Sequence, residues 1–208
     1  WIAKWNKVSE RAQKLIGSLD GWSEAVIART IAATIPNGTA LFVSSSRPIR
    51  DLEGFAHPRG GVYTYANRGL AGIDGNISTA LGVAYGHKAT IAVLGDLSFL
   101  HDLTGLVNKE AINCRFIVIN NDGGGIFSTL PQRGVNGFET VFGTPHGLNP
   151  AAIAQAMGVD AKQISSLKEL EAEIKAPISG VSVVVCDVPD RESNADNLKK
   201  IVEALTSI

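Results

Sequence analysis

The sequence predicts an α/β protein, a three-layer sandwich in which helices cover both faces of a mostly parallel sheet of five or six strands. Three observations lead to this prediction. Short apolar runs rich in β-branched residues recur along the chain, as expected of strands that are buried on both faces. Segments with apolar residues at helical spacing separate these runs. Glycine, asparagine or serine follows most runs directly, which is typical of tight turns between a strand and a helix.

The chain begins with two predicted helices. Residues 1–19 place apolar side chains on one helical face and lysines and glutamates on the other. We interpret residues 1–20 as a linker helix that arrives from a preceding domain, and residues 21–208 as one domain. The second helix covers residues 21–35, with a serine cap at its start. Glu24, in its first turn, is expected on a solvated face.

Two predicted strands follow, at residues 39–44 and 62–66. Three serines and two arginines come after the first strand, at residues 44–50, where we predict a loop. Hydroxyl and guanidinium groups at the end of a strand are placed to meet an anion, although a solvated loop with serine turns explains them equally well. Arg68 follows the second strand and is the strongest candidate for binding a carboxylate, because its guanidinium can form two parallel hydrogen bonds.

Residues 89–127 form the centre of the predicted fold, with strands at 90–94 and 116–119 and a helical segment at 99–110 between them. In such a βαβ unit both strands end at the same edge of the sheet, where ligands of open α/β sheets bind. This edge collects a carboxylate, a hydroxyl, a carboxamide and glycine backbone groups, supplied by Asp96, Ser98, Asn121 and residues 123–125.

These residue types indicate a metal–diphosphate site. Asp96 and Asn121 offer hard oxygen ligands, and the chain after Asn121 can add a backbone carbonyl. Such ligands suit Mg²⁺, which usually combines a few protein ligands with phosphates and water. The N–H groups after Asp96 open a helix, where a phosphate is favoured. The pattern is neither a phosphate loop with Gly-Lys-Ser/Thr nor a Gly-x-Gly-x-x-Gly dinucleotide turn.

The remaining segments are predicted to contain a long loop, four helices and a strand. Residues 128–147 are rich in glycine and proline and suit an ordered active-site loop, in which His146 is expected to be an ordinary surface residue. A helix is also expected from the glycines at 72–75 to about residue 85. The other helices are expected at 149–157, 166–175 and 193–205, and a buried strand at 181–187.

Composition narrows the class of protein. The 208 residues are 45% hydrophobic, enough to bury one substantial core, and the formal net charge of −1 gives no reason to expect nucleic acid binding. No apolar run is long enough to span a membrane. Cys114 and Cys186 lie in or beside apolar strand runs, so both are expected to be buried reduced thiols. The four histidines show no zinc-binding spacing.

The motifs around the central unit resemble those of thiamine diphosphate enzymes. In that family, Gly-Asp-x at one strand end and Asn-Asn about two dozen residues later hold Mg²⁺ and the diphosphate. Here the first motif is Gly95-Asp96-Leu97, where the family usually has Gly-Asp-Gly, and the second is Asn120-Asn121. Together with Asn67-Arg68-Gly69, these motifs are similar to one branch of the family, the 2-succinyl-5-enolpyruvyl-6-hydroxy-3-cyclohexene-1-carboxylate synthases of menaquinone (vitamin K2) biosynthesis.

The resemblance implies that residues 21–208 are the thiamine diphosphate-binding domain, the last of three in such an enzyme. It implies thiamine diphosphate and Mg²⁺ (or Mn²⁺) as cofactors, with a bulky residue wedged between the two cofactor rings. Residues implied to hold the metal are Asp96, Asn121 and Gly123 through its carbonyl. Residues implied to bind the organic cofactor are Gly72, Ile73, Gly95, Asp96, Leu97, Ser98, Asn121, Gly123 and Ile126. Those implied to bind substrate carboxylates are Ser46, Arg50 and Arg68; Arg47 has no counterpart that we can assign.

The resemblance also implies the activity of the complete enzyme, a transferase. It would decarboxylate 2-oxoglutarate and add the succinyl semialdehyde unit to isochorismate, in the cytoplasm, as a homodimer or dimer of dimers. The glutamate that activates the cofactor is expected in the N-terminal domain, which with the middle domain is missing here. No residue of this chain matches it, since Glu24 and Glu169 are expected on helix surfaces. The chain alone is therefore expected to have no catalytic residue and no activity.

Two alternatives stay open on the sequence. The chain could belong to another thiamine diphosphate enzyme, such as a 2-oxoacid decarboxylase or an acetolactate synthase, although these are not expected to pair Asn67-Arg68-Gly69 with Arg50. It could also be a non-catalytic phosphate-binding module on a flavodoxin-like sheet.

Overall fold

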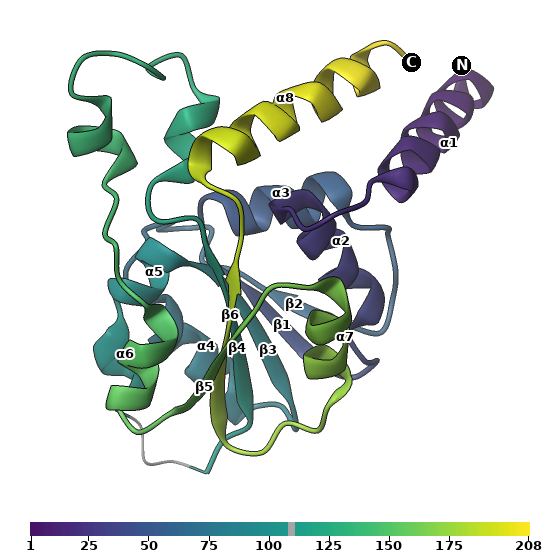
Figure 1. The fold of residues 1–208 in the computed structure, drawn as a ribbon. Helices are drawn as coiled ribbons and strands as arrows, with labels where there is room; N and C mark the ends of the chain where they lie inside the picture. Colours follow the sequence, from purple (N-terminus) through teal and green to yellow (C-terminus); the bar gives the residue numbers. More distant parts are fainter. Residues whose placement is uncertain (108–110) are drawn as a thin grey trace.

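A computed structural model describes residues 1–107 and 111–208 of the chain. Six strands form one sheet in the order β2-β1-β3-β4-β6-β5, and every neighbouring pair is parallel (Figure 1). The strands are β1 (Ala40–Val43), β2 (Tyr63–Tyr65), β3 (Thr90–Gly95), β4 (Cys114–Asn120), β5 (Asp160–Ile164) and β6 (Val181–Asp187). The predicted α/β sandwich is confirmed, and its sheet is entirely parallel.

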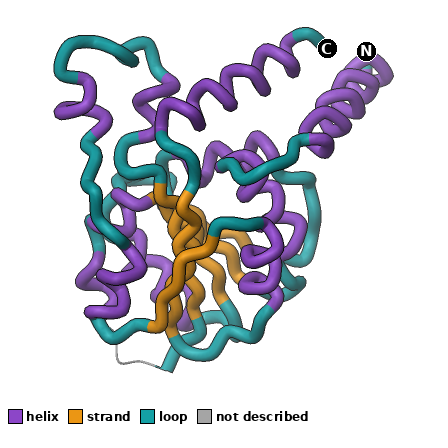
Figure 2. The backbone as a smooth tube through the Cα atoms, viewed as in Figure 1, coloured by secondary structure: helices purple, strands orange, loops and turns teal. Residues whose placement is uncertain are grey.

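Helices cover both faces of this sheet, as the backbone trace shows (Figure 2). One face carries α4 (Asn76–Tyr85), α5 (Asp96–Leu100) and α6 (Pro150–Ala156). The other carries α2 (Glu24–Thr34), α3 (Arg47–Phe55) and α7 (Leu167–Lys175). Two further helices, α1 (Ile2–Ser18) and α8 (Arg191–Thr206), project from the end of the molecule where the strands finish (Figure 1).

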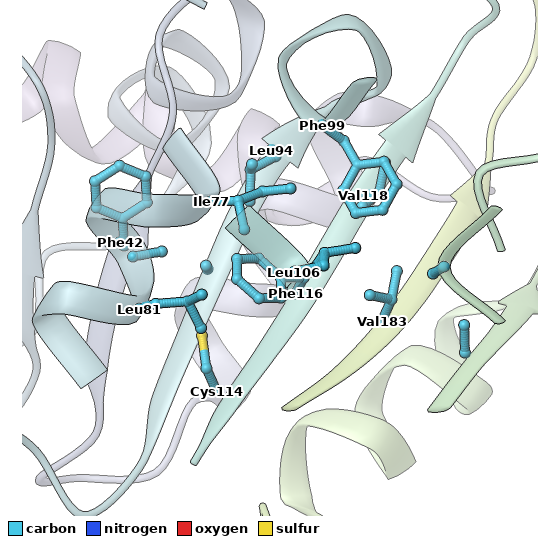
Figure 3. Packing of buried hydrophobic residues seen from close by; sticks show 14 of the residues in the cluster. Phe42, Ile77, Leu81, Leu94, Phe99, Leu106, Cys114, Phe116, Val118 and Val183 are labelled. Atoms are coloured by element: carbon cyan, nitrogen blue, oxygen red, sulfur yellow. The ribbon is translucent and has the colours of Figure 1, made fainter. Parts of the chain in front are cut away.

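Successive side chains of each strand point alternately to the two faces of the sheet and so fill two hydrophobic cores. Phe42 and Phe116 point to the α4 side, where they pack with Ile77 and Phe99 (Figure 3). Neighbouring strand residues such as Ile117 pack against α2 and α7 on the other side. Each fully buried side chain of this size contributes roughly 1.5–3 kcal/mol. The sheet is therefore a rigid platform for the loops at its carboxyl edge.

The two cysteines are free and buried in the sheet, as the sequence predicts. Cys114 lies in β4 and Cys186 in β6, and burial raises the pKa of both thiols, that of Cys114 to about 12. Both therefore stay protonated and act as small apolar side chains.

Two elements were not predicted. No predicted element covers β5, because this strand lies at the sheet edge and buries only Ala161 and Ile164, so no apolar run marks it. The predicted loop at 44–50 is wrong in its second half, since α3 begins at Arg47 with proline in its first turn and buries Leu52 and Phe55.

The predicted helix at 99–110 is shorter than expected. It consists of α5, which begins at Asp96, and a 3₁₀ turn at Leu103–Leu106; its last residues, 108–110, lie outside the described part. The predicted loop at 128–147 contains one π-helical turn, Glu139–Gly143, and follows a 3₁₀ turn at Gly125–Thr129.

The first helix, α1, contacts the rest of the molecule through its second half, where Arg11 donates to the Ile208 carbonyl at 3.4 Å. Ile16 packs with Phe55 of α3 and Ile201 of α8, whereas Trp1 and Trp5 at the other end are exposed. The interpretation of residues 1–20 as a linker stays a prediction. Within residues 1–107 and 111–208, no helix is both long and apolar enough to cross a membrane.

Candidate functional site

Asp96 joins the carboxyl ends of two neighbouring strands. It follows β3 directly and is only 3% exposed. Its Oδ1 accepts the Leu97 N–H at 2.7 Å, and its Oδ2 accepts the Gly123 N–H, from the loop after β4, at 2.8 Å. Burial raises the pKa of Asp96, and the two N–H groups lower it in part. The structure thus brings together two of the predicted metal ligands.

Asn121 is the second buried group at this edge. Its Nδ2 donates to Oε1 of Glu24 at 2.6 Å. Its Oδ1 is buried and has no hydrogen-bond partner within the described residues. Gly125 approaches this amide so closely that a Cβ there would overlap with Nδ2. A buried acceptor without a partner carries a desolvation penalty, so this oxygen is suited to a bound cation or donor.

The loop after β4 is held in place by the segment at 143–147. Gly123 adopts a φ of 132°, and its carbonyl accepts the Gly125 N–H at 3.0 Å. Asp122, also at positive φ, accepts the N–H groups of His146 and Gly147 at 3.0 and 2.7 Å. Non-glycine residues at positive φ are uncommon and concentrate at functional sites.

His146 is not the surface residue that the sequence analysis predicts. Its side chain is 9% exposed, and Nε2 lies 3.3 Å from Oδ2 of Asp96. Since Nδ1 accepts the Leu148 N–H, the proton lies on Nε2 and is donated to Asp96. The surrounding glycines and prolines indicate a loop but carry no signal of burial, so sequence reasoning missed this contact.

A second loop, at residues 72–76, is hydrogen-bonded to α5. The Ser98 hydroxyl donates to the carbonyl of Ile73 at 2.9 Å, and Asn76 Nδ2 donates to the same carbonyl at 2.8 Å. The carbonyl of Gly72 accepts from the Ser45 hydroxyl at 3.0 Å. The side chains of Ile73, Leu97 and Ile126 are all half-buried around this edge, as is Gly95.

Two of the three predicted substrate-binding residues lie together. Ser46, directly before α3, has a φ of 72°, and its carbonyl accepts a hydrogen bond from the Arg50 guanidinium at 2.7 Å. Arg68 lies after β2 and is exposed. It lines a cavity of about 470 Å³ that Ile49 and Leu52 of α3 also line. Within the described residues, Arg68 forms no hydrogen bond with Ser46 or Arg50.

A buried polar group behind Asn121 was missed by the sequence analysis. Glu24, expected on a solvated face, has a side chain only 10% exposed. Arg47 Nε lies 3.8 Å from Glu24 Oε2, and the Arg47 guanidinium also binds Asp51. We name Glu24, Arg47 and Asp51 the acid–arginine cluster. The prediction failed because α2 buries the four consecutive residues that follow Glu24, so it has no broad solvated face at this end.

Burial dominates the acid–base properties of this cluster. It raises the pKa of Glu24, against the Asn121 hydrogen bond and the charge of Arg47. It raises the pKa of Asp51 to about 7, although Arg47 is beside it. The cluster and Asn121 line a cavity of about 30 Å³, enough for one water molecule.

Comparison with known proteins places this geometry in a family. Residues 53–188 match the model of the thiamine pyrophosphate (thiamine diphosphate) enzyme, C-terminal TPP binding domain. The chain is 38% identical over 203 residues to the 2-succinyl-5-enolpyruvyl-6-hydroxy-3-cyclohexene-1-carboxylate synthase of Thermobifida fusca, covering 93% of this chain and 36% of that protein. It is 36% identical to the synthase of the same name from Bacillus cytotoxicus, covering 97% of this chain and 36% of the relative.

The fold agrees with this assignment. Benzoylformate decarboxylase from Polynucleobacter necessarius superposes with a TM-score of 0.62 at 18% identity, over 79% of this chain and 33% of that one. The chain spans about a third of the length of the curated relatives that it matches. The chain therefore belongs to the thiamine pyrophosphate enzymes, as a member of their C-terminal TPP-binding domain family.

Proposed function

We propose that this chain is the cofactor-binding domain of a synthase that decarboxylates 2-oxoglutarate and adds the succinyl unit to isochorismate. One observation supports the cofactor site above all others: Asp96 bridges the ends of β3 and β4, and beside it Asn121 keeps a buried amide oxygen unpaired within the described residues. The similarity to two 2-succinyl-5-enolpyruvyl-6-hydroxy-3-cyclohexene-1-carboxylate synthases supports the choice of these two substrates.

The donor set fits Mg²⁺. Asp96, the Asn121 Oδ1 and the Gly123 carbonyl are hard oxygens, and a carboxylate has about four lone-pair sites, of which three meet donors here. The described residues contain no group of three or more His, Cys, Asp or Glu side chains able to hold a metal. A cation here would therefore combine the Asp96 carboxylate with amide and carbonyl oxygens and with ligand phosphates, as Mg²⁺ does.

The remaining roles are assigned on the same basis. Backbone groups of Gly95, Leu97 and Ser98 would hold the diphosphate at the start of α5. The side chains of Ile73 and Ile126 would flank the cofactor rings, and Gly72 would lie beside the cofactor next to Ile73. When bound, thiamine diphosphate supplies the electron sink that lets carbon dioxide leave a 2-oxo acid. Substrate carboxylates would bind Ser46, Arg50 and Arg68.

The proposal extends to the whole protein. We propose that the activating glutamate lies in an N-terminal domain outside this chain, that a middle domain separates the two, and that the complete protein works as a cytoplasmic homodimer or dimer of dimers. The structure gives no reason to place the activating role on Glu24, because its carboxylate is bound to Asn121 and close to Arg47.

The test uses the full-length protein. Thiamine diphosphate and flavin mononucleotide are titrated with and without Mg²⁺, and carbon dioxide release from 2-oxoglutarate is measured with isochorismate present. We expect Mg²⁺-dependent binding of thiamine diphosphate alone, release of carbon dioxide, and no turnover by the 208-residue chain. Binding of the flavin instead would favour a phosphate-binding module, and preference for pyruvate would favour an acetolactate synthase.

Arg68→Lys is expected to impair use of the dicarboxylate substrate. Lysine keeps the charge but loses the planar fork, which removes about 1.5–3 kcal/mol of charge-assisted hydrogen bonding. We expect kcat/KM for 2-oxoglutarate to fall roughly 10- to 100-fold, with cofactor affinity nearly unchanged. Steady-state kinetics and calorimetry on the full-length protein measure the two effects.

Arg59→Lys is the matched control for this variant. Arg59 lines the same cavity, but its guanidinium donates to backbone carbonyls, including that of Ile35 at 2.9 Å. It should alter stability rather than substrate kinetics. A drop in cofactor affinity with unchanged substrate kinetics in Arg68→Lys would move Arg68 to the diphosphate site.

A further inference from the structure

The acid–arginine cluster lies directly behind the proposed metal ligand Asn121. Glu24 Oε1 accepts the Asn121 Nδ2 hydrogen at 2.6 Å, and Asn121 and Gly95 line the same water-sized cavity as the cluster. Three separate elements, α2, α3 and the loop after β4, supply these groups. Burying charged groups in this way costs folding free energy unless each of them has a hydrogen-bond or ion-pair partner.

The hydrogen bond to Glu24 determines which way the Asn121 amide faces. A carboxylate can only accept hydrogen bonds, whereas the two ends of a carboxamide differ: nitrogen donates and oxygen accepts. The nitrogen of Asn121 must therefore face Glu24, because the reverse orientation would set two acceptors against each other. The oxygen is left on the other side, where it is buried without a partner among the described residues.

Neighbouring groups hold both partners of this bond. Arg47 supplies positive charge 3.8 Å from the second Glu24 oxygen and is itself bound to Asp51. Gly125 also lies beside this amide, since a Cβ there would overlap with Asn121 Nδ2, so only glycine fits next to it. Contacts from Arg47 and Gly125 thus surround the pair formed by Glu24 and Asn121.

We propose that Glu24 is a positioning residue for the metal: by accepting the Asn121 amide hydrogen, it commits the Asn121 oxygen to Mg²⁺. This inference rests on the proposed function, because it takes the edge around Asp96 and Asn121 to be the metal site. It gives a role to an acid that neither the sequence motifs nor the substrate assignment uses.

The test exchanges the polarity of the hydrogen bond in the full-length protein. Glu24→Gln has nearly the same shape but can also donate to the Asn121 oxygen, and Asn121→Asp sets two carboxylates against each other. We expect each single variant to weaken Mg²⁺ affinity at least about tenfold, measured by calorimetry in the presence of thiamine diphosphate. The double variant should recover to within about threefold of wild type. In it the new glutamine amide donates to the new carboxylate, which restores the bond and leaves one carboxylate oxygen for the metal.

Two further measurements separate positioning from general damage. Glu169→Gln removes an exposed carboxylate whose hydrogen bonds are to Ser165 and Ser166, outside Asn121 and the acid–arginine cluster, so Mg²⁺ affinity should stay at the wild-type value. At saturating Mg²⁺, the affinity of the Glu24→Gln variant for thiamine diphosphate should change less than its affinity for the metal. A purely structural role for Glu24 would lower both together.

The outcomes decide between the inference and the proposed function. Wild-type Mg²⁺ affinity in Glu24→Gln, or a double variant no better than Asn121→Asp, overturns the role of Glu24 while the metal site stands. If Glu24→Gln does not fold, the comparison of Asn121→Asp with the double variant still decides. Absence of Mg²⁺-dependent thiamine diphosphate binding in wild type overturns the proposed function, and this inference with it.

Discussion

Asp96→Ala is expected to abolish Mg²⁺-dependent binding of thiamine diphosphate by the full-length protein while leaving it folded. The variant removes a carboxylate that accepts N–H groups from Leu97 and Gly123, at the ends of both strands. The same carboxylate is a proposed metal ligand. Loss of a direct charged ligand should lower affinity at least about 100-fold, equivalent to roughly 2.7 kcal/mol. The fold should persist because the two cores lie below this edge and do not include Asp96. Calorimetry with and without Mg²⁺ measures the effect.

Asp160→Ala provides the control for Asp96→Ala. Asp160 is an exposed carboxylate on the edge strand β5, away from the ends of β3 and β4. Its removal should leave cofactor affinity unchanged. Mg²⁺-dependent affinity that survives in Asp96→Ala would refute the metal site proposed here.

Gly123→Ala is expected to have the second-largest effect, on both stability and cofactor binding. An added Cβ would overlap with the carbonyl oxygen of Gly143, and the φ of 132° is one that alanine rarely adopts. The loop must then shift, which breaks the Gly123 N–H bond to Asp96 and separates the loop from residues 143–147. Steric overlap together with backbone strain should destabilise the chain by roughly 2–4 kcal/mol.

Gly134→Ala separates these two causes. Gly134 also has positive φ, at 79°, but a Cβ there would meet nothing within 4 Å. It should therefore show backbone strain alone, of about 1–2 kcal/mol, with cofactor affinity intact. Urea unfolding and thiamine diphosphate calorimetry compare the pair. Equal behaviour of the two variants would show that the contact with Gly143 has no influence on the site.

The centre of the fold could be predicted because its signals are local. Apolar runs mark β3 and β4, and parallel strands joined by a helix must end at one edge, so Asp96 and Gly123 were expected to be neighbours. What the sequence did not show depends on contacts between distant segments. Glu24 and Asn121 are 97 positions apart, and His146 lies 50 positions from Asp96.

Two elements escaped prediction for a different reason. The strand β5 alternates too few apolar residues to be distinguished from a loop, and only pairing with β6 makes it a strand. In α3, the serine and arginine run suggested a loop, whereas the helix is held by Leu52, which packs in the core against the sheet, and by Phe55, which packs with Ile16 and Ile201. In both cases tertiary packing outweighs the local pattern.

The entirely parallel sheet also has a kinetic consequence. Parallel neighbours cannot be joined by a tight hairpin, so each of the five strand pairs forms only after a crossover has closed. For β4 and β6 the intervening chain includes another strand and two helices. Loop-closure entropy is lost before such contacts can stabilise the chain, which makes folding slow. The β3–β4 unit has the shortest such crossover in the centre of the sheet, so it is the natural folding nucleus. The outer strands must then add to it while their apolar surfaces are still exposed to solvent, and in this state the chain is prone to aggregation.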